Sequence, residues 1–198
     1  MYFLAKRLFD IVASTIALLL FSPVFIVISV WIALDSRGGV FYKQIRVGKG
    51  QKEFGLLKFR SMRPNSDKSG QLTIGNDSRV TNVGRFIRKY KLDEVPQLIN
   101  ILKGEMSVVG PRPEVPKYVN MYSKQQLRVL EVLPGLTDYA SIEYLDEQKV
   151  LGASDDPEKT YIEEVMPAKL NLNLKYISDR SFFLDLKLVF KTIGKILR

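Results

Sequence analysis

The sequence predicts an α+β protein dominated by helices, with an N-terminal re-entrant membrane helix-break-helix, one small β-hairpin, and amphipathic helices in a membrane interface. Three observations support this fold class. Residues 11–34 carry no charge, residues 40–62 contain the best pair of strand patterns, and apolar residues elsewhere recur mainly at helical spacing. The 198 residues suffice for one domain with its own core, but not for two ordinary domains and an anchor.

The uncharged segment is long enough to cross a membrane, but it is interrupted at its centre. Its 24 residues, at about 1.5 Å each, exceed a hydrocarbon core of about 30 Å. Pro23 removes a helical hydrogen bond, and the hydroxyl of Ser22 can bond back to a freed carbonyl. Each apolar half is then only about 16 Å long, roughly half of the core.

Basic residues flank this segment on both sides. Lys6 and Arg7 precede it, and five cations follow it within residues 37–52. By the positive-inside rule, both ends belong in the cytoplasm. We therefore predict that residues 1–36 enter and leave the membrane on the same side, with a kinked span as the alternative. A signal peptide is disfavoured, because the apolar run is too long and lacks a small-residue cleavage site.

Residues 40–48 and 53–62 have the patterns of two strands joined around residues 48–50, where two glycines flank a lysine. Because side chains alternate along a strand, Lys58 and Arg60 should share one face. Two cations on one face can meet a diphosphate, but they can equally form a solvated surface.

A loop and a short helix are expected next. Residues 63–82 are rich in Pro, Asn, Asp, Ser, Gly and Thr, which predicts a loop near the site. Residues 83–90 form a short helical pattern with Arg85 and Arg88 as neighbours on one face. One of these arginines can neutralise a substrate phosphate or orient Asp93, and a plain salt bridge is the alternative.

The stretch that organises the site begins with two adjacent carboxylates, Asp93 and Glu94. Apolar residues recur at helical spacing from residue 95 to residue 102, so the pair should open a helix, with Pro96 in its first turn. The positive end of the helix dipole favours ionised carboxylates. Such a pair can hold Mg²⁺, and one member can attack a phosphorus; the alternative is that both are ordinary caps.

The segment GPRP comes after this helix, which should end near Gly104. Pro111 and Pro113 restrict the backbone on either side of Arg112. A guanidinium on so stiff a segment suits a planar or phosphate-bearing ligand.

Three further patterns predict helices after GPRP. Ser123 and Gln126 have capping-box spacing and predict a helix over residues 124–133. Pro157 marks the start of a helical pattern that reaches residue 176, with an interruption at Pro167. The tail is amphipathic, with an apolar face opposite a basic stripe of Lys187, Lys191 and Lys195. It can pack on the domain by its apolar face, but we favour a position in an anionic membrane interface because of the basic stripe.

Composition excludes several kinds of chemistry. The chain has no cysteine and no histidine, which excludes disulfides, Cys or His zinc sites, and His-based triads. A net charge of +9 suits nucleic acid, an anionic membrane or a phosphorylated substrate. We expect no nucleic-acid partner, because the sequence has no helix-turn-helix or RNA-binding aromatic motif. A non-enzymatic scaffold would explain the N-terminal segment and the tail, but not GPRP or the acidic pair.

The run DSRVTNVGRFIRKYKLDEVPQLIN, followed by LKGEMSVVGPRP, resembles the catalytic core of the bacterial sugar transferases, which are monotopic polyprenyl-phosphate phosphoglycosyl transferases. The resemblance covers most of the chain and is strongest over residues 54–113. It implies a re-entrant hairpin over residues 1–36, kinked at Ser22 and Pro23, and a cytoplasmic catalytic domain over residues 37–198. The expected location is the cytoplasmic face of the bacterial inner membrane, against anionic lipid.

The resemblance also implies a reaction. A phosphosugar passes from a UDP-sugar to polyprenyl (undecaprenyl) phosphate and UMP is released, as the initiating membrane step of bacterial glycoconjugate assembly. Asp93 would attack the phosphorus to form an aspartyl-phosphosugar intermediate, and together with Glu94 it would hold Mg²⁺. Arg112 would contact the uridine, and the substrate-binding residues implied are Lys58, Arg60, Arg88, Pro111, Arg112 and Pro113.

The chain departs from the family pattern at PGLTDYASIEY, where many members have a segment of the form PGITGWAQVNG. Asp138, Tyr139 and Ser141 replace the usual residues, so this segment is a candidate for encoding sugar preference. The sequence leaves open which UDP-sugar is used, which glycan is made, which carboxylate is the nucleophile, and whether the protein forms a homodimer.

Overall fold

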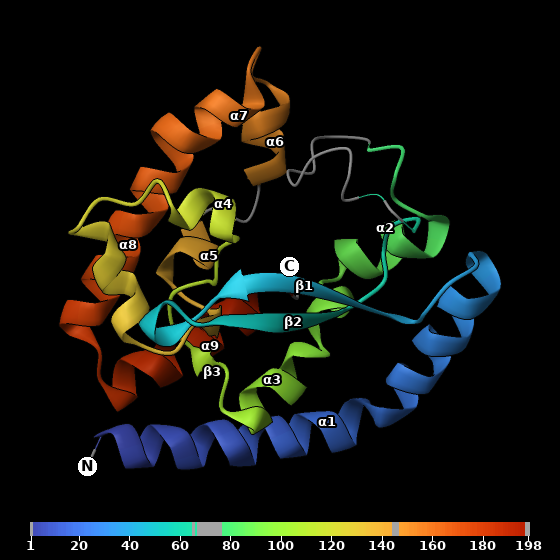
Figure 1. Cartoon of the computed structure of the whole chain (residues 1–198). Helices are drawn as coiled ribbons and strands as arrows, with labels where there is room; N and C mark the ends of the chain where they lie inside the picture. Colours follow the sequence, from blue (N-terminus) through green and yellow to red (C-terminus); the bar gives the residue numbers. More distant parts are fainter. Residues whose placement is uncertain (1, 65, 67–76, 144–146, 197–198) are drawn as a thin grey trace.

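The N-terminal segment forms one long helix, α1 (Tyr2–Asp35), in the computed structural model, which describes residues 2–64, 66, 77–143 and 147–196. The helix is continuous through Pro23, so the expected break in secondary structure is absent. Figure 1 shows instead that α1 changes direction and that its C-terminal part rises towards α2 (Asn82–Lys89). Re-entry into a membrane stays a prediction.

The local chemistry around Pro23 explains why the helix bends without breaking. A helical N–H at position 23 would bond to the carbonyl of Leu19, but proline has none. The hydroxyl of Ser22 donates to that same carbonyl at 2.8 Å. The serine therefore occupies the acceptor that the proline leaves free, as the sequence predicts.

The faces of α1 are inverted relative to a soluble amphipathic helix. Asp10 and Ser14 are buried against the rest of the chain, whereas Leu4, Leu20 and Leu34 are exposed. The carboxylate of Asp10 accepts hydrogen bonds from the Ser107 hydroxyl at 3.0 Å and from the Val108 N–H at 2.9 Å. By length and composition, α1 is the one helix of the described residues able to cross a membrane.

A second set of contacts holds the N-terminal part of α1 to the domain, and it leads to a prediction. The Arg7 guanidinium donates to the carbonyls of Ile101 and Leu102, at 2.7 and 2.9 Å, in addition to the contacts of Asp10. We therefore expect Pro23→Ala alone to leave the start of α1 on the same side of the membrane as the domain, because moving it across would break these bonds.

The chain lacks cysteine, so Phe3→Cys supplies a single exposed reporter for a membrane-impermeant thiol reagent. Labelling after lysis, but not in intact cells, is the expected result with and without Pro23→Ala. Labelling of intact cells in the Pro23→Ala background would mean that the proline alone sets the topology.

The predicted hairpin is confirmed. Strand β1 (Phe41–Val47) pairs antiparallel with β2 (Glu53–Phe59) through the short 3-10 turn η1 (Lys49–Gln51). Gly50 occupies the left-handed region at φ 67°, which favours glycine at this turn. The register sets Tyr42 opposite Lys58, so one half-buried face of the hairpin carries polar side chains towards the middle of the molecule.

The short helix after the loop is also confirmed, but the acidic pair does not open the next helix. Thr81 caps α2 by accepting the Gly84 N–H at 2.9 Å. Asp93 and Glu94 lie in a separate 3-10 turn, η3 (Leu92–Glu94), and helix α3 (Gln97–Lys103) begins only after Pro96. The ring of Pro96 offers no N–H to extend the turn, so the helix starts one residue later. Much of the predicted loop, residues 65 and 67–76, lies outside the described residues.

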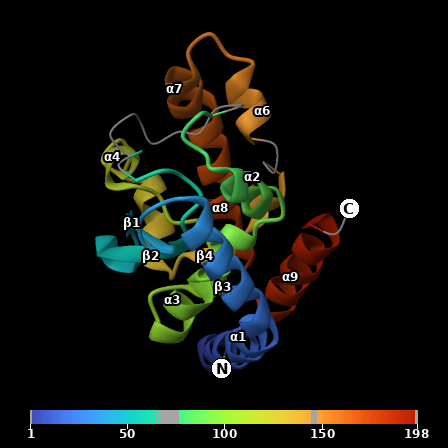
Figure 2. The same ribbon diagram turned by 90° about the vertical axis from the view of Figure 1, so that its right-hand side faces the viewer.

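The remaining elements form a mainly helical half around the main hydrophobic core (Figures 1 and 2). Two short strands pair in parallel, β3 (Ser107–Val109) with β4 (Gly135–Thr137). A Cβ on Gly135 would lie 2.1 Å from the Gly110 nitrogen, so both glycines let the chains cross in contact. The other elements are α4 (Pro116–Val119), η4 (Gln126–Glu131), α5 (Tyr139–Glu143), α6 (Glu147–Gly152), α7 (Pro157–Thr160), η5 (Tyr161–Val165), α8 (Met166–Asp179) and α9 (Phe182–Ile196).

Two predicted helix starts are confirmed, but the segments after them differ from the prediction. Ser123 and Gln126 form the reciprocal capping box, yet the helix after it is the short 3-10 helix η4 rather than a helix over residues 124–133. Asp156 caps α7, with Pro157 in its first turn. The predicted interruption is the π-helix η5, which ends just before Pro167, where the missing N–H makes regular α-helical bonding impossible.

Helix α9 combines features of both alternatives for the tail. Asp185 and Leu188 are buried against the domain, while Phe183 and Phe190 stay exposed. Lys187 and Lys191 lie on its outer side, and the ammonium of the third stripe residue donates to a backbone carbonyl of α5. Packing on the domain is therefore present, and placement in a membrane interface stays a prediction.

Candidate functional site

The predicted site residues come together where the hairpin, η3 and the GPRP segment meet. A large open cavity of about 2020 Å³ lies there, lined by side chains that are far apart in the sequence. The left-handed residue Lys91, at φ 56°, reverses the chain between α2 and η3 and so brings both elements to the cavity. Its lining includes Lys58, Arg88, Asp93, Glu94 and Arg112.

Glu94 is the anionic centre of an ion-pair cluster. The guanidinium of Arg112 donates one hydrogen bond to each carboxylate oxygen of Glu94, in the paired geometry that gives the strongest such contacts. The Lys58 ammonium lies 3.6 Å from Glu94 Oε1. Burial raises the pKa of Glu94, but Arg112 and Lys58 outweigh it and hold that pKa well below its ordinary value.

Asp93 has the opposite electrostatic character although it is the adjacent residue. Its side chain is buried, with 7% exposed. Burial, and secondly the charge of Glu94, raise the pKa of Asp93 above its ordinary value, while Lys58 and Arg88 oppose the rise. The two carboxylates are thus distinguished: Glu94 is held as a weakly basic anion, and Asp93 is the more basic of the pair.

Lys58, on strand β2, is partly buried at this cluster, with 17% of its side chain exposed. Burial lowers the pKa of Lys58 to about 8, although the charge of Glu94 favours its ammonium form. Near neutral pH the ammonium still predominates, so the cluster presents a cation beside both carboxylates.

This perturbed lysine predicts a pH-dependent stability. Between about pH 8, its pKa in the fold, and its ordinary pKa of 10.5, the unfolded chain retains a proton that the folded chain loses, so stability rises with pH. In Lys58→Met this contribution is absent. We expect the stability of the parent relative to this variant to rise by up to about 3 kcal/mol between pH 7 and pH 10.5. Urea unfolding in detergent across this range checks it, and a constant difference would contradict the lowered pKa of Lys58.

Arg60 does not join the ion-pair cluster, although it lines the same cavity. Its guanidinium donates to the carbonyls of Ser36 and Arg37, each at 2.7 Å, at the C-terminal end of α1. A cation suits this negative end of the helix dipole. Lys58 and Arg60 both line the cavity, but the Arg60 guanidinium reaches the end of α1, whereas the Lys58 ammonium reaches Glu94.

The two prolines of GPRP act through their backbone carbonyls. Pro111 accepts from the Gly135 N–H at 2.9 Å, and Pro113 accepts from the Arg46 guanidinium at 3.0 Å. These bonds fix both sides of Arg112, and a direct contact of the prolines with substrate stays a prediction.

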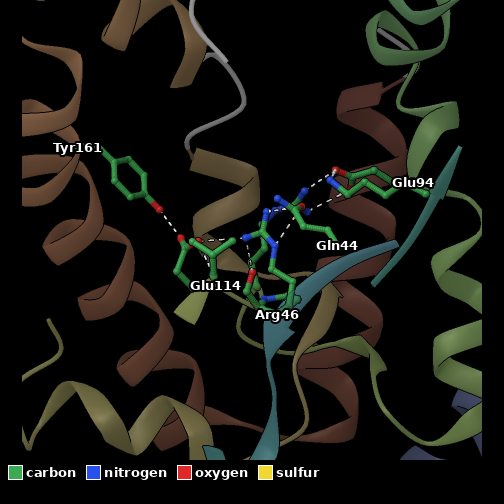
Figure 3. A network of polar contacts seen from close by, with 9 residues as sticks. Gln44, Arg46, Glu94, Glu114 and Tyr161 are labelled. Carbon is green, nitrogen blue, oxygen red and sulfur yellow. Dashed lines mark hydrogen bonds and ion pairs between the residues drawn. The ribbon is translucent and has the colours of Figure 1, made fainter. Parts of the chain in front are cut away.

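A polar network that the sequence does not reveal supports this segment (Figure 3). Figure 3 shows Tyr161, Glu114, Arg46 and Gln44 leading one after another towards Glu94. Arg46 donates to Glu114 Oε1 at 3.0 Å and to Gln44 Oε1 at 2.8 Å, and Tyr161 donates to Glu114 Oε2. The sequence signals for it are weak: alternate polar residues on the first strand, and a glutamate directly after GPRP.

Asp138 links GPRP to the segment in which the chain departs from the family pattern. Its fully buried carboxylate accepts from the Arg112 N–H at 3.2 Å and from the Ser141 N–H at 2.6 Å. One carboxylate therefore joins the backbone of the site arginine to the start of α5. The sequence singled out Asp138 without assigning it a contact.

The sequence predicts that the acidic pair holds Mg²⁺. The described residues contain no group of three or more acidic, His or Cys side chains arranged for a metal. Mg²⁺ usually takes one or two protein carboxylates together with substrate phosphates and water. Asp93 and Glu94 fit that pattern, although both oxygens of Glu94 accept from Arg112 in this structure.

Comparison with known proteins gives relatives across the whole chain. The chain is 41% identical over 201 residues to UDP-N-acetylgalactosamine-undecaprenyl-phosphate N-acetylgalactosaminephosphotransferase of Aeromonas hydrophila, an alignment of 99% of this chain and 44% of that protein. It is 40% identical over 197 residues to UDP-glucose:undecaprenyl-phosphate glucose-1-phosphate transferase of Escherichia coli (strain K12), covering 97% and 40% respectively. It is 38% identical over 192 residues to uncharacterized sugar transferase EpsL of Bacillus subtilis (strain 168), covering 97% and 87%.

The chain thus spans less than half of the first two relatives and most of the third. The sequence model of one family, described as bacterial sugar transferase, matches residues 1–198. Because this match includes α1, the hairpin, the acidic pair and GPRP together, the chain belongs to the bacterial sugar transferase family.

Proposed function

We propose that the protein transfers a phosphosugar from a UDP-sugar to polyprenyl phosphate, releasing UMP and forming a polyprenyl-diphospho-sugar. The observation that carries the proposal is the electrostatic division of the acidic pair inside a cavity lined by cations. The Aeromonas and Escherichia relatives, whose names describe sugar-phosphate transfer to undecaprenyl phosphate, support it.

Asp93, rather than Glu94, is the nucleophile in this proposal. Both oxygens of Glu94 accept from Arg112, which lowers their basicity, whereas burial makes Asp93 more basic. An Asp93 oxygen attacks the phosphorus that bears the sugar, and the bond from that phosphorus to the bridging oxygen breaks, so UMP leaves. An oxygen of the polyprenyl phosphate then attacks the same phosphorus and regenerates the Asp93 carboxylate.

The cations of the site have distinct tasks. The charges of Lys58 and Arg88 favour the ionised form of Asp93. In this proposal both cations also offset the charge of the phosphoryl group during transfer. Arg112 holds Glu94 and contacts the nucleotide. Mg²⁺ bound by Asp93 and Glu94 would neutralise diphosphate oxygens.

The arrangement of α1 suits an enzyme with one soluble and one lipid substrate. Its exposed apolar surface and its buried Asp10 favour lipid on one side and the domain on the other. We assign residues 1–36 to the membrane and residues 37–198 to a catalytic domain on the cytoplasmic face. In this arrangement the acidic pair would act on a phosphate at headgroup depth.

The test is nucleotide release from a panel of UDP-sugars by detergent-solubilised protein with Mg²⁺ and undecaprenyl phosphate, with UMP and UDP resolved. Lipid-dependent UMP that disappears with EDTA is the expected result. UDP as product would indicate ordinary glycosyl transfer and overturn the role of Asp93, while UMP release that persists in EDTA would remove the metal from the proposal.

A further inference from the structure

Two polar atoms in the wall of the site cavity are buried without a partner. The side-chain oxygen of Asn173, on α8, and the hydroxyl of Ser141, on α5, are shielded from solvent and make no hydrogen bond with the described residues. Asn173 is only 4% exposed. Leaving a buried polar group unsatisfied costs about 1–3 kcal/mol, so such atoms are uncommon without a function.

Both atoms belong to the same cavity as the acidic pair. Ser141 and Asn173 line it together with Asp93, Glu94 and Arg112. Ser141 is linked to Arg112 through Asp138, whose carboxylate accepts from the backbone N–H groups of both residues. The position of Ser141 is therefore tied to GPRP, while Asn173 belongs to the site through the shared cavity wall.

The apolar surroundings of these atoms narrow the ligand chemistry. Met166 and Leu170 precede Asn173 on α8 by seven and three residues, so all three side chains share one face of the helix. All three also line the cavity, as does Ala140 beside Ser141. The wall thus combines a hydrogen-bond acceptor, a hydroxyl and an apolar patch.

We propose that Ser141 and Asn173 form the subsite for the sugar of the donor and that this subsite accepts an acetamido substituent. The amide N–H of that group would donate to the Asn173 oxygen, its carbonyl would accept from the Ser141 hydroxyl, and its methyl would contact Met166 and Leu170. A plain hexose hydroxyl offers no methyl to this patch. The inference rests on the proposed function for the identity of the donor.

The experiment compares acetamido donors, UDP-N-acetylglucosamine and UDP-N-acetylgalactosamine, with UDP-glucose and UDP-galactose. For Ser141→Ala and for Asn173→Leu, we expect the ratio of kcat/KM for acetamido over hexose donors to fall roughly tenfold to a hundredfold. The matched control is Asn171→Leu, an exposed position on the same helix, for which the ratio should not change.

A stability measurement separates a binding role from a structural one. Replacing an unpaired buried oxygen by an apolar group of similar shape is neutral or stabilising, so the Tm of Asn173→Leu should equal or exceed that of the parent. A lower Tm with an unchanged donor ratio would show that a buried water satisfies the atom, and would overturn the subsite. An equal loss for all four donors would also overturn it.

Calorimetric binding of the same four nucleotides to the parent protein distinguishes this inference from the proposed function. Tighter binding of acetamido donors, lost in the two variants, would support the subsite even if no UMP were released. Release of UMP with equal affinity and equal kcat/KM for all donors would refute the subsite and leave the proposed function standing.

Discussion

Asp93→Asn will reduce lipid-dependent UMP release by at least about 10⁴-fold, because an uncharged amide cannot act as the nucleophile. The substitution keeps the size of the side chain and should preserve the fold. It should also preserve or raise the Tm near pH 7, because the pKa of the Asp93 carboxyl is raised in the fold. Because that pKa is raised in the fold, the parent protein loses stability as the pH rises above the ordinary value of 3.8 and Asp93 ionises, whereas the asparagine variant does not.

The covalent step has its own readout. With Mg²⁺, UDP-sugar and no lipid, the parent protein should release up to one equivalent of UMP per active site, and Asp93→Asn should release none. Glu94→Gln is the informative companion: we expect it to lower the rate but to keep the single-turnover burst. A burst that persists in Asp93→Asn and vanishes in Glu94→Gln would reverse the assignment of the two carboxylates.

Local sequence signals predicted those parts of the fold that depend on neighbouring residues. The hairpin follows from two alternating runs around Gly48 and Gly50, and α2 follows from its apolar spacing. The prediction that the acidic pair opens a helix was wrong, because the pair lies in a separate turn. Apolar spacing from residue 95 does not show that Pro96 separates this turn from the helix. The bend in α1 was predicted through Ser22 and Pro23, but a continuous helix was not.

The charged residues that the resemblance implies lie close together, but the contacts that support them were not predicted. Lys58, Arg88, Asp93, Glu94 and Arg112 all line one cavity, and their roles stay predictions. The supporting contacts join residues that are distant in the chain. Arg46 pairs with Glu114, 68 residues later, and the Asp138 carboxylate accepts from the backbone of GPRP. No local periodicity reports such pairings. Arg60 was predicted to bind substrate with the other cations, but its guanidinium bonds the carbonyls at the end of α1 and does not join the cluster around Glu94.

Arg112→Lys should be nearly as damaging as Arg112→Ala, with a loss of roughly 10²–10³-fold in kcat/KM. The guanidinium makes two parallel bonds to Glu94, and a lysine ammonium cannot reproduce them. Removing the arginine also leaves the largely shielded carboxylate of Glu94 with Lys58 as its remaining cation, which should destabilise the fold by up to about 3 kcal/mol. Arg128→Lys is the matched control, since Arg128 forms an exposed pair with Glu131 that contributes about 0–1 kcal/mol at most.

The combined variant Glu94→Gln/Arg112→Met shows whether Arg112 acts through Glu94 or on the nucleotide. If the arginine mainly holds the glutamate, the double variant should regain stability relative to Arg112→Met, and the effects on kcat should be far from additive. If Arg112 mainly binds the uridine moiety, its loss should raise KM for every UDP-sugar while kcat changes little, and Glu94→Gln should add independently. Because the guanidinium bonds both oxygens of Glu94, we expect the first pattern, with a KM effect superimposed on it.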